Sequence, residues 1–268
     1  MAYIRSRTAK AAALLLILAA WFGHPCEAGY FQDANLLYKN NKYDEAVSAY
    51  EKILEGGFES GALYYNLGNS YFKKGDLGRA LLNYERAKIF IPHDSDLRSN
   101  HNFVRNILNV PPRYSSEPWF LRWLDRSFDG IAMNSLTVLA GALWFLILII
   151  LASILWLPSL KRPAVPLAVI LAVMLLACSV ALGRKAVSYE RGALIIAGGV
   201  EAKFEPRDGA TTYFSIPEGS FVTILDRSGA WVKVRRHDAK IGWVKDKAVA
   251  AIRQSAAGQD AMSALQRP

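Results

Sequence analysis

The chain has 268 residues, of which 52% are hydrophobic, and 32 Lys and Arg against 23 Asp and Glu give it a net charge of +9. No basic run is interleaved with aromatic residues, which excludes a nucleic-acid-binding groove. The two cysteines, Cys26 and Cys178, lie in a targeting segment and an apolar segment. The soluble parts therefore hold neither a disulfide framework nor a cysteine-based zinc site.

Residues 1–28 read as a secretory signal peptide. Three basic residues precede the apolar stretch 11–22, which is too short to span a bilayer. Cys26-Glu27-Ala28 places small residues at positions −3 and −1 of a cleavage site, so we expect the mature chain to begin at Gly29. The alternative, lipoprotein processing at Cys26, is disfavoured by the preceding Gly23-His24-Pro25.

Residues 30–55 and 64–89 align with each other without gaps, at one constant offset along the sequence. The identical pairs are Tyr30/Tyr64, Asn35/Asn69, Lys39/Lys73, Ala46/Ala80, Tyr50/Tyr84 and Glu51/Glu85. A period of about 34 residues, as here, is typical of the tetratricopeptide repeat (TPR), a pair of antiparallel helices. The pattern therefore predicts an all-α TPR solenoid over residues 29–110.

Small residues mark where the paired helices approach closely. We expect Ala34/Gly68 and Ala46/Ala80 at these contacts, and the pairs Tyr30/Tyr64 and Tyr50/Tyr84 in the core. Gly75-Asp76 predicts the turn within the second repeat, and Pro92 its end. Asp94-Ser95-Asp96 predicts the N-cap of a final helix, Leu97–Leu108, that covers the end of the stack.

The first helix of each repeat lines the concave face of a TPR stack. On this pattern, the partner-binding groove presents Phe31, Asn35, Tyr38, Lys39, Tyr65, Asn69, Phe72 and Lys73. Repetition of the fold explains the buried tyrosines. For the Asn and Lys pairs, burial is a poor explanation, which leaves ligand contact and simple repetition of the fold both open.

A linker and an interfacial helix are predicted over residues 111–135. Pro111-Pro112 begins the linker, and five apolar residues then share one helical face: Trp119, Phe120, Trp123, Leu124 and Phe128. Such an amphipathic, tryptophan-bearing helix suits the membrane–water interface. The alternative is a stripe that binds a partner.

Two uncharged stretches, 136–157 and 164–183, are each long enough to cross the hydrocarbon core. A short connection containing Lys161 and Arg162 joins them into a transmembrane hairpin. Two buried core helices are the alternative, which their length and lack of a polar face disfavour. Since neither stretch carries an ionisable residue, we interpret the hairpin as an anchor rather than a transport path.

The signal peptide and the even number of spans predict the topology. Both soluble modules lie on the periplasmic side of a bacterial inner membrane, and Lys161 and Arg162 are cytoplasmic, as the positive-inside rule prefers. Arg184, Lys185 and Arg191 on the exported side run against that rule.

Residues 190–252 change to a strand pattern, and 253–268 read as a flexible tail. Short β-branched runs are predicted as strands over 193–197, 200–204, 221–226, 231–236 and 241–244. Gly229-Ala-Trp231-Val-Lys-Val234 and Ile241-Gly-Trp243-Val244 resemble a bacterial SH3 domain, a small all-β barrel, with both tryptophans as core or rim anchors. The loop Lys203-Phe-Glu-Pro-Arg207 departs from the usual pattern.

No catalytic constellation appears in the sequence, and we expect neither an enzyme nor a cofactor. No phosphate-binding glycine loop, nucleophile elbow or metal-ligand helix motif is present. His93 and His101 lie near Asp94 and Asp96, but those carboxylates are expected to cap a helix, so no metal site is predicted.

The whole order resembles the BatE proteins of Bacteroides-aerotolerance operons. The resemblance covers most of residues 29–252. It rests on the signal peptide, the Tyr65–Asn69 stretch Tyr-Asn-Leu-Gly-Asn, the tryptophan-rich segment before the membrane hairpin, the hairpin itself and the SH3-like end. It implies a role in envelope stress tolerance beside membrane proteins with von Willebrand A domains and, indirectly, a MoxR-type ATPase.

We expect a multidomain membrane protein that acts as a non-enzymatic scaffold or adaptor, with the TPR groove binding a protein partner. A second hypothesis is an envelope-sensing receptor whose basic SH3-like module binds peptidoglycan. A third hypothesis, a wall hydrolase, is disfavoured because the sequence shows neither a nucleophile–base pair nor a set of metal ligands.

Overall fold

A computed structural model describes residues 25–110, 118–128, 130–157 and 161–253 of the chain. Residues 1–24 of the predicted signal peptide, the prolines at 111–112 and the tail from 254 lie outside the described residues. Contacts divide the chain into two compact units, one ending at Phe58 and the other beginning at Glu59. The division falls inside the stretch predicted as the TPR module.

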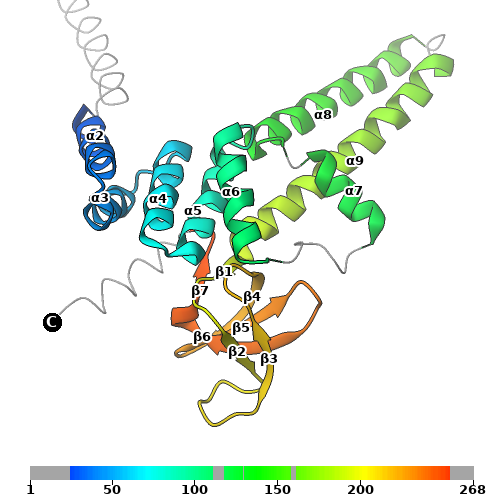
Figure 1. Ribbon diagram of the computed structural model, residues 1–268. Coiled ribbons are helices and arrows are strands. Elements are labelled where there is room, and N and C mark those ends of the chain that lie inside the picture. Colours follow the sequence, from blue (N-terminus) through cyan, green and yellow to red (C-terminus); the bar gives the residue numbers. More distant parts are fainter. Residues whose placement is uncertain (1–24, 111–117, 129, 158–160, 254–268) are drawn as a thin grey trace, which may run out of the picture. The chain divides into compact units, whose positions relative to one another are not determined.

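The N-terminal unit is a helical hairpin of α2 (Pro25–Lys39) and α3 (Tyr43–Glu55), drawn in blue in Figure 1. Ala34 and Ala46 are fully buried between the helices, as their small size predicts, and Tyr50 is buried beside them. Tyr30 is 59% exposed, which corrects its predicted place in the core. Its repeat partner Tyr64 stacks on Phe90, whereas the position equivalent to Phe90 in the first copy is Gly56, which offers no ring.

The C-terminal unit begins with a second hairpin, α4 (Gly61–Lys74) and α5 (Leu77–Phe90), followed by α6 (Ser95–Ile107). Ser60 accepts the Leu63 N–H and caps α4, and Gly75 ends it in the left-handed conformation. Asp76 and Asp94 cap α5 and α6 with their carboxylates. The predicted turn and the predicted cap are thus confirmed.

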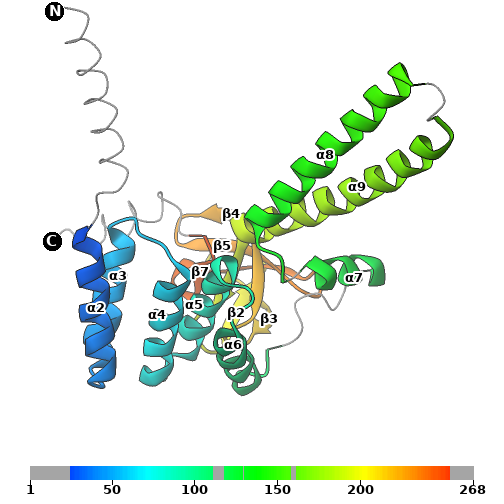
Figure 2. The ribbon, with the colours of Figure 1, turned by 90° about the horizontal axis from the view of Figure 1, so that it is seen from above.

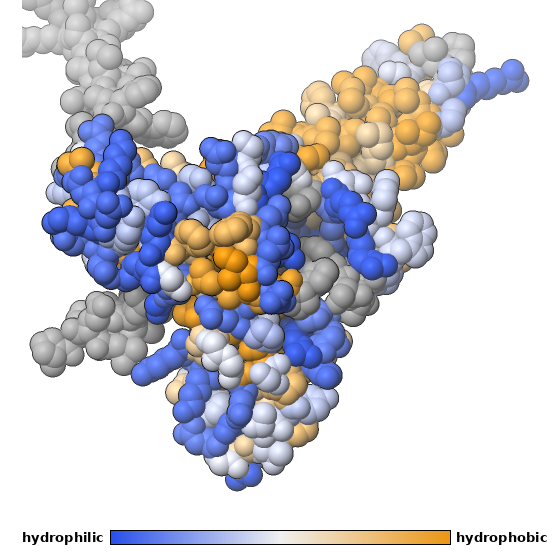
Figure 3. Space-filling view, in the orientation of Figure 1, coloured by the Kyte–Doolittle hydropathy of each residue, from blue (hydrophilic) through white to orange (hydrophobic). Residues whose placement is uncertain are grey.

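Next come α7 (Trp119–Phe128), α8 (Met133–Trp156) and α9 (Lys161–Arg191). α8 and α9 lie side by side and are, by length and composition, able to cross a membrane (Figures 1 and 2). Figure 3 shows the apolar surface that covers them. Large apolar side chains such as Val138, Phe145 and Leu176 are more than 60% exposed, which does not suit core helices of a soluble protein.

α9 continues past the uncharged stretch 164–183 and reaches Arg191, so it is about 46 Å long at 1.5 Å per residue. It then passes directly into β1, without the linker that a separate module would have. This continuity ties the apolar helix α9 to the sheet.

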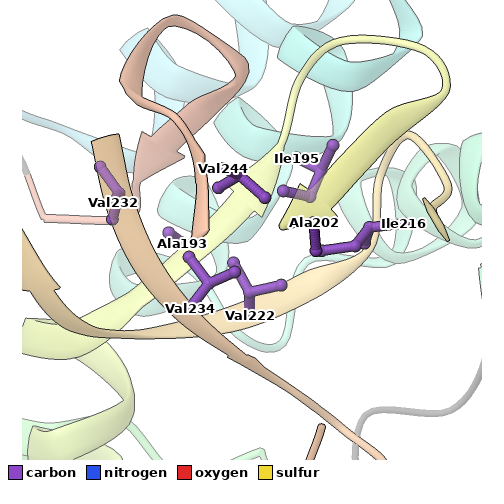
Figure 4. Close-up of a cluster of buried hydrophobic side chains, with 8 residues drawn as sticks. All are labelled: Ala193, Ile195, Ala202, Ile216, Val222, Val232, Val234 and Val244. Atoms are coloured by element: carbon purple, nitrogen blue, oxygen red, sulfur yellow. The ribbon is translucent and has the colours of Figure 1, made fainter. Parts of the chain in front are cut away.

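The sheet is antiparallel, with the strand order β3-β2-β6-β5-β4-β1-β7. The strands are β1 (Gly192–Ile195), β2 (Val200–Lys203), β3 (Thr212–Ile216), β4 (Phe221–Ser228), β5 (Trp231–Arg236), β6 (Ile241–Lys245) and β7 (Val249–Ala251), with the short 3-10 helix η2 (Asp246–Ala248) before the last. β3 and β7 were not predicted. Eight small and branched side chains form the core of the sheet (Figure 4).

Candidate functional site

One hydrogen bond recurs in both helical hairpins. The Tyr50 hydroxyl donates to Asn35 Oδ1 over 2.6 Å, and the Tyr84 hydroxyl donates to Asn69 Oδ1 over 2.7 Å. Each bond links the first helix of a hairpin to the second, and both tyrosines are buried. The paired asparagines that the sequence placed in a ligand groove therefore have an internal structural bond.

The predicted groove residues lie in two rows. The first row is on α2, where Phe31 packs on Tyr50, Tyr38 packs on Tyr43, and Lys39 is exposed. The second row is on α4, where Tyr65, Asn69, Phe72 and Lys73 share one face at helical spacing. The rows belong to different compact units.

The row on α4 continues onto α6, a helix that the repeat pattern did not place in the predicted groove. Asn100 Nδ2 donates to the Tyr65 hydroxyl over 3.0 Å and to Asn69 Oδ1 over 3.1 Å. Phe103 meets the edge of the Phe72 ring with 5.9 Å between centroids. Asn100 and Leu97 stand one repeat length after Asn66 and Leu63, so extending the repeat would have placed the predicted final helix in the groove.

Together these two helices present a polar–aromatic surface, which we call the α4–α6 face, formed by Tyr65, Asn69, Phe72, Lys73, Asn100, Phe103 and Ile107. Phe103 and Ile107 are 56% and 46% exposed. Aromatic residues are enriched in the buried cores of protein interfaces, and polar side chains in their rims.

A second surface lies on the outer side of the sheet. Cross-strand pairing sets Lys203 and Lys233 on either side of Trp243, and Lys245 opposite Trp231. The Lys233 ammonium lies 5.6 Å from the centre of the Trp243 ring, within cation–π range. Neither tryptophan belongs to the central core cluster: Trp243 is half-buried among lysines, whereas Trp231 is buried beneath Lys203 and Lys245. We call this surface the Lys–Trp face.

The β2–β3 loop that departs from the usual SH3 pattern lies near Trp231. Lys245 forms an ion pair of 2.7 Å with Asp208, and Lys203 Nζ donates to the Asp208 backbone carbonyl. Lys245 holds the pKa of the Asp208 carboxyl below its usual range, chiefly through their hydrogen bond. Both lysines also lie within 6 Å of the Trp231 ring centre.

The sheet and the helices of the C-terminal unit are joined by polar and apolar contacts. The Arg86 guanidinium on α5 donates to the carbonyls of Ala251 and Ile252 over 2.8 and 2.9 Å. Glu218 Oε1 accepts the Gly78 N–H over 2.7 Å. Gly219 has φ of +76° and no room for a side chain, because a Cβ would stand 2.7 Å from Leu108. The β3–β4 turn therefore packs against the start of α5 and the end of α6.

His101 is buried and pairs with Glu85 over 2.8 Å rather than with the carboxylates near His93. Within the described part of the chain, no group of three or more His, Cys, Asp and Glu side chains could hold a metal ion.

Comparison with known families identifies the sheet. The bacterial SH3 domain family matches residues 203–250, which run from the end of β2 into β7. No curated protein matches the chain. The antiparallel sheet is thus a bacterial SH3-like domain, a class of module that suggests binding to proteins or to the cell wall.

Proposed function

We propose that this chain is a non-enzymatic, membrane-anchored scaffold whose helical repeats bind a protein partner in the cell envelope. The observation that carries the proposal is the α4–α6 face, where half-buried and exposed aromatic side chains, amides and Lys73 gather on two neighbouring helices. The constant spacing of the two sequence copies and the matching Asn–Tyr bonds support TPR-type repeats as its basis.

The anchor in this proposal is the α8–α9 hairpin in the inner membrane, with the helices and the SH3-like domain on the periplasmic side. The resemblance to BatE proteins supplies the partner class, namely membrane proteins with von Willebrand A domains, and through them a MoxR-type ATPase. Aerotolerance or another envelope stress response is the corresponding process.

The test is a binding measurement on the full chain in detergent, with a purified von Willebrand A domain protein from the same operon as the probe. Lys73→Glu and Phe103→Ser both alter the α4–α6 face, and we expect each to weaken binding at least fivefold. Arg98→Glu is the matched control, because Arg98 is exposed on another side of α6. Equal affinity of all four proteins, with unchanged helicity, would exclude this face as the binding site.

Wall binding by the SH3-like domain is a second candidate function, and the Lys–Trp face favours it. Aromatic rings can stack on sugar rings, and lysines can attract carboxylates of wall peptides. Co-sedimentation with purified sacculi tests this candidate. Trp243→Ala should reduce the bound fraction, whereas Trp119→Ala, on α7 outside the sheet, should not. Loss in neither variant would argue against the Lys–Trp face.

A further inference from the structure

A cavity of about 120 Å³ lies where α8 begins and where the uncharged part of α9 ends. Its walls come from α5, α7, the start of α8, the last turns of α9 and the residue after β7. Pockets for drug-sized ligands usually measure about 300–1,000 Å³. This cavity is suited to a small polar group rather than to a whole peptide.

The cavity lies at headgroup level if α8 and α9 cross a bilayer. The 20 uncharged residues 164–183 cover about 30 Å, the thickness of the hydrocarbon core. Arg184 and Lys185 follow at once and line the cavity. Trp119 and Trp123, on the neighbouring α7, are 73% and 63% exposed, and tryptophan is enriched at this depth.

Three cationic side chains, Lys88, Arg184 and Lys185, and two carboxylates, Glu85 and Asp125, line the cavity. Asp125 accepts two hydrogen bonds from Arg184, over 2.9 and 2.7 Å, and Glu85 is paired with His101. Lys185 is held in place by the Ile131 carbonyl, over 2.6 Å. Lys88 enters from α5. Three cations against two carboxylates leave the lining one positive charge in excess, which favours an anion.

The start of α8 adds to this preference. Ala132 stands at its N-cap and has no side chain that could accept the first backbone N–H groups. Those groups carry partial positive charge and bind anions readily. Ser188 adds a hydroxyl to the wall.

From these contacts we propose that the cavity binds the phosphate of an anionic phospholipid, with the acyl chains lying along the exposed apolar side chains of α8 and α9. Because Lys88 belongs to the soluble helices, a bound lipid would join them to the membrane. The proposal rests on the membrane placement of α8 and α9 in the proposed function and is independent of the α4–α6 face.

Native mass spectrometry of the full chain tests it, with phosphatidylglycerol and phosphatidylcholine as the two probes. We expect one phosphatidylglycerol to remain bound per chain and to raise the melting temperature, with phosphatidylcholine bound more weakly. Lys88→Gln should weaken phosphatidylglycerol binding about fivefold, the effect of roughly one interfacial cation. Lys88→Arg keeps the charge and should retain binding.

Lys161→Gln is the matched control, since it removes one charge from the opposite end of α9. Equal loss in Lys88→Gln and Lys161→Gln would mean only general attraction to anionic membranes and would overturn the site. Equal binding of both lipids would do the same. If inorganic phosphate alone raises the melting temperature as much as the lipid, the ligand is a soluble anion and the lipid assignment is wrong.

Discussion

At the scale of single residues, the contact between α4 and α5 depends on Gly68, which has no side chain, and on the amide of Asn69. Gly68 lies under the Tyr84 ring, and the hydroxyl of that ring bonds Asn69. A Cβ built at Gly68 would stand 2.7 Å from two ring atoms of Tyr84. The ring can reach Asn69 only while the helices are this close.

Gly68→Leu should therefore destabilise the chain by about 1–3 kcal/mol, because the added side chain overpacks the Tyr84 contact. The measurement is the melting temperature of the detergent-solubilised chain. Gly209→Leu is the control, since a Cβ there meets nothing within 4 Å. An unchanged melting temperature for Gly68→Leu would contradict the close approach.

A double-mutant cycle measures the repeated hydrogen bond. Asn69→Ala and Tyr84→Phe should each lower stability, and their coupling energy should be about 0.5–1.5 kcal/mol. This expectation assigns Asn69 a structural role besides any contact with a partner. Additive effects of the two substitutions would show that the bond contributes nothing.

Asp238 gives the β5–β6 turn a pH-dependent contact. Arg236 donates to both of its carboxylate oxygens, over 2.9 and 2.5 Å, and holds the pKa of Asp238 well below its usual range. A depressed pKa stabilises the fold above the unfolded value of about 3.9, and this stabilisation fades as the pH falls toward the folded pKa.

Asp238→Asn should thus lower stability at pH 7 by about 1–2 kcal/mol, since the carboxylate is partly exposed. Melting curves of both proteins at pH 7 and pH 3 check this. The gap between them should be smaller at pH 3. A gap of the same size at both values would show that the ion pair does not account for it.

At the scale of elements, α5 is a helix that packs against the sheet. Arg86 is half-buried on it, and desolvation lowers the pKa of its guanidinium while two backbone carbonyls accept its N–H groups. The guanidinium also lies over the Tyr64 ring, 5.7 Å from its centre. Hydrogen bonds from a charged donor are among the stronger ones in proteins.

Arg86→Met should loosen the edge of the sheet at β7 and lower stability by about 1.5–3 kcal/mol. Hydrogen exchange at Ala251 and Ile252 gives the local readout, together with the melting temperature. Arg98→Met is the control, because Arg98 is exposed on α6. Unchanged exchange at these two residues would mean that other contacts hold the strand.

At the scale of the whole molecule, α9 connects the apolar α8–α9 hairpin to α7 and to the sheet. It packs along α8, its end contacts the sheet, and Arg184 ties it to α7. The SH3-like domain is thus attached to the rest of the C-terminal unit by α9 and by Arg86, rather than by a flexible linker. A partner on the α4–α6 face and a ligand on the Lys–Trp face would therefore bind the same compact unit.

Alkaline phosphatase fusions after Asn109 and after Arg253 test the topology. Both should be active if the proposed topology holds, because an exported N-terminal module followed by two spans would return the chain to the periplasm. Activity at one site only would show that the two modules lie on opposite sides of the membrane. Inactivity at both would place them in the cytoplasm.

The sequence by itself determined the elements whose patterns are local. The repeat spacing predicted α3, α4 and α5, Asp94 predicted the start of α6, and the uncharged stretches predicted α8 and α9, because periodicity and capping act within a few residues. It missed β3 and β7, short strands that form through pairing with β2 and β1, their cross-strand neighbours.

Only the tertiary structure decided what the candidate side chains contact. Asn69 bonds a tyrosine 15 residues away in the sequence, and Arg86 bonds carbonyls more than 160 residues away. At such separations, spacing along the sequence does not predict which side chains meet. Tyr30 is exposed although its repeat partner is buried, because burial depends on the ring that faces it. Side-chain contacts of this kind follow from packing, which brings distant segments together.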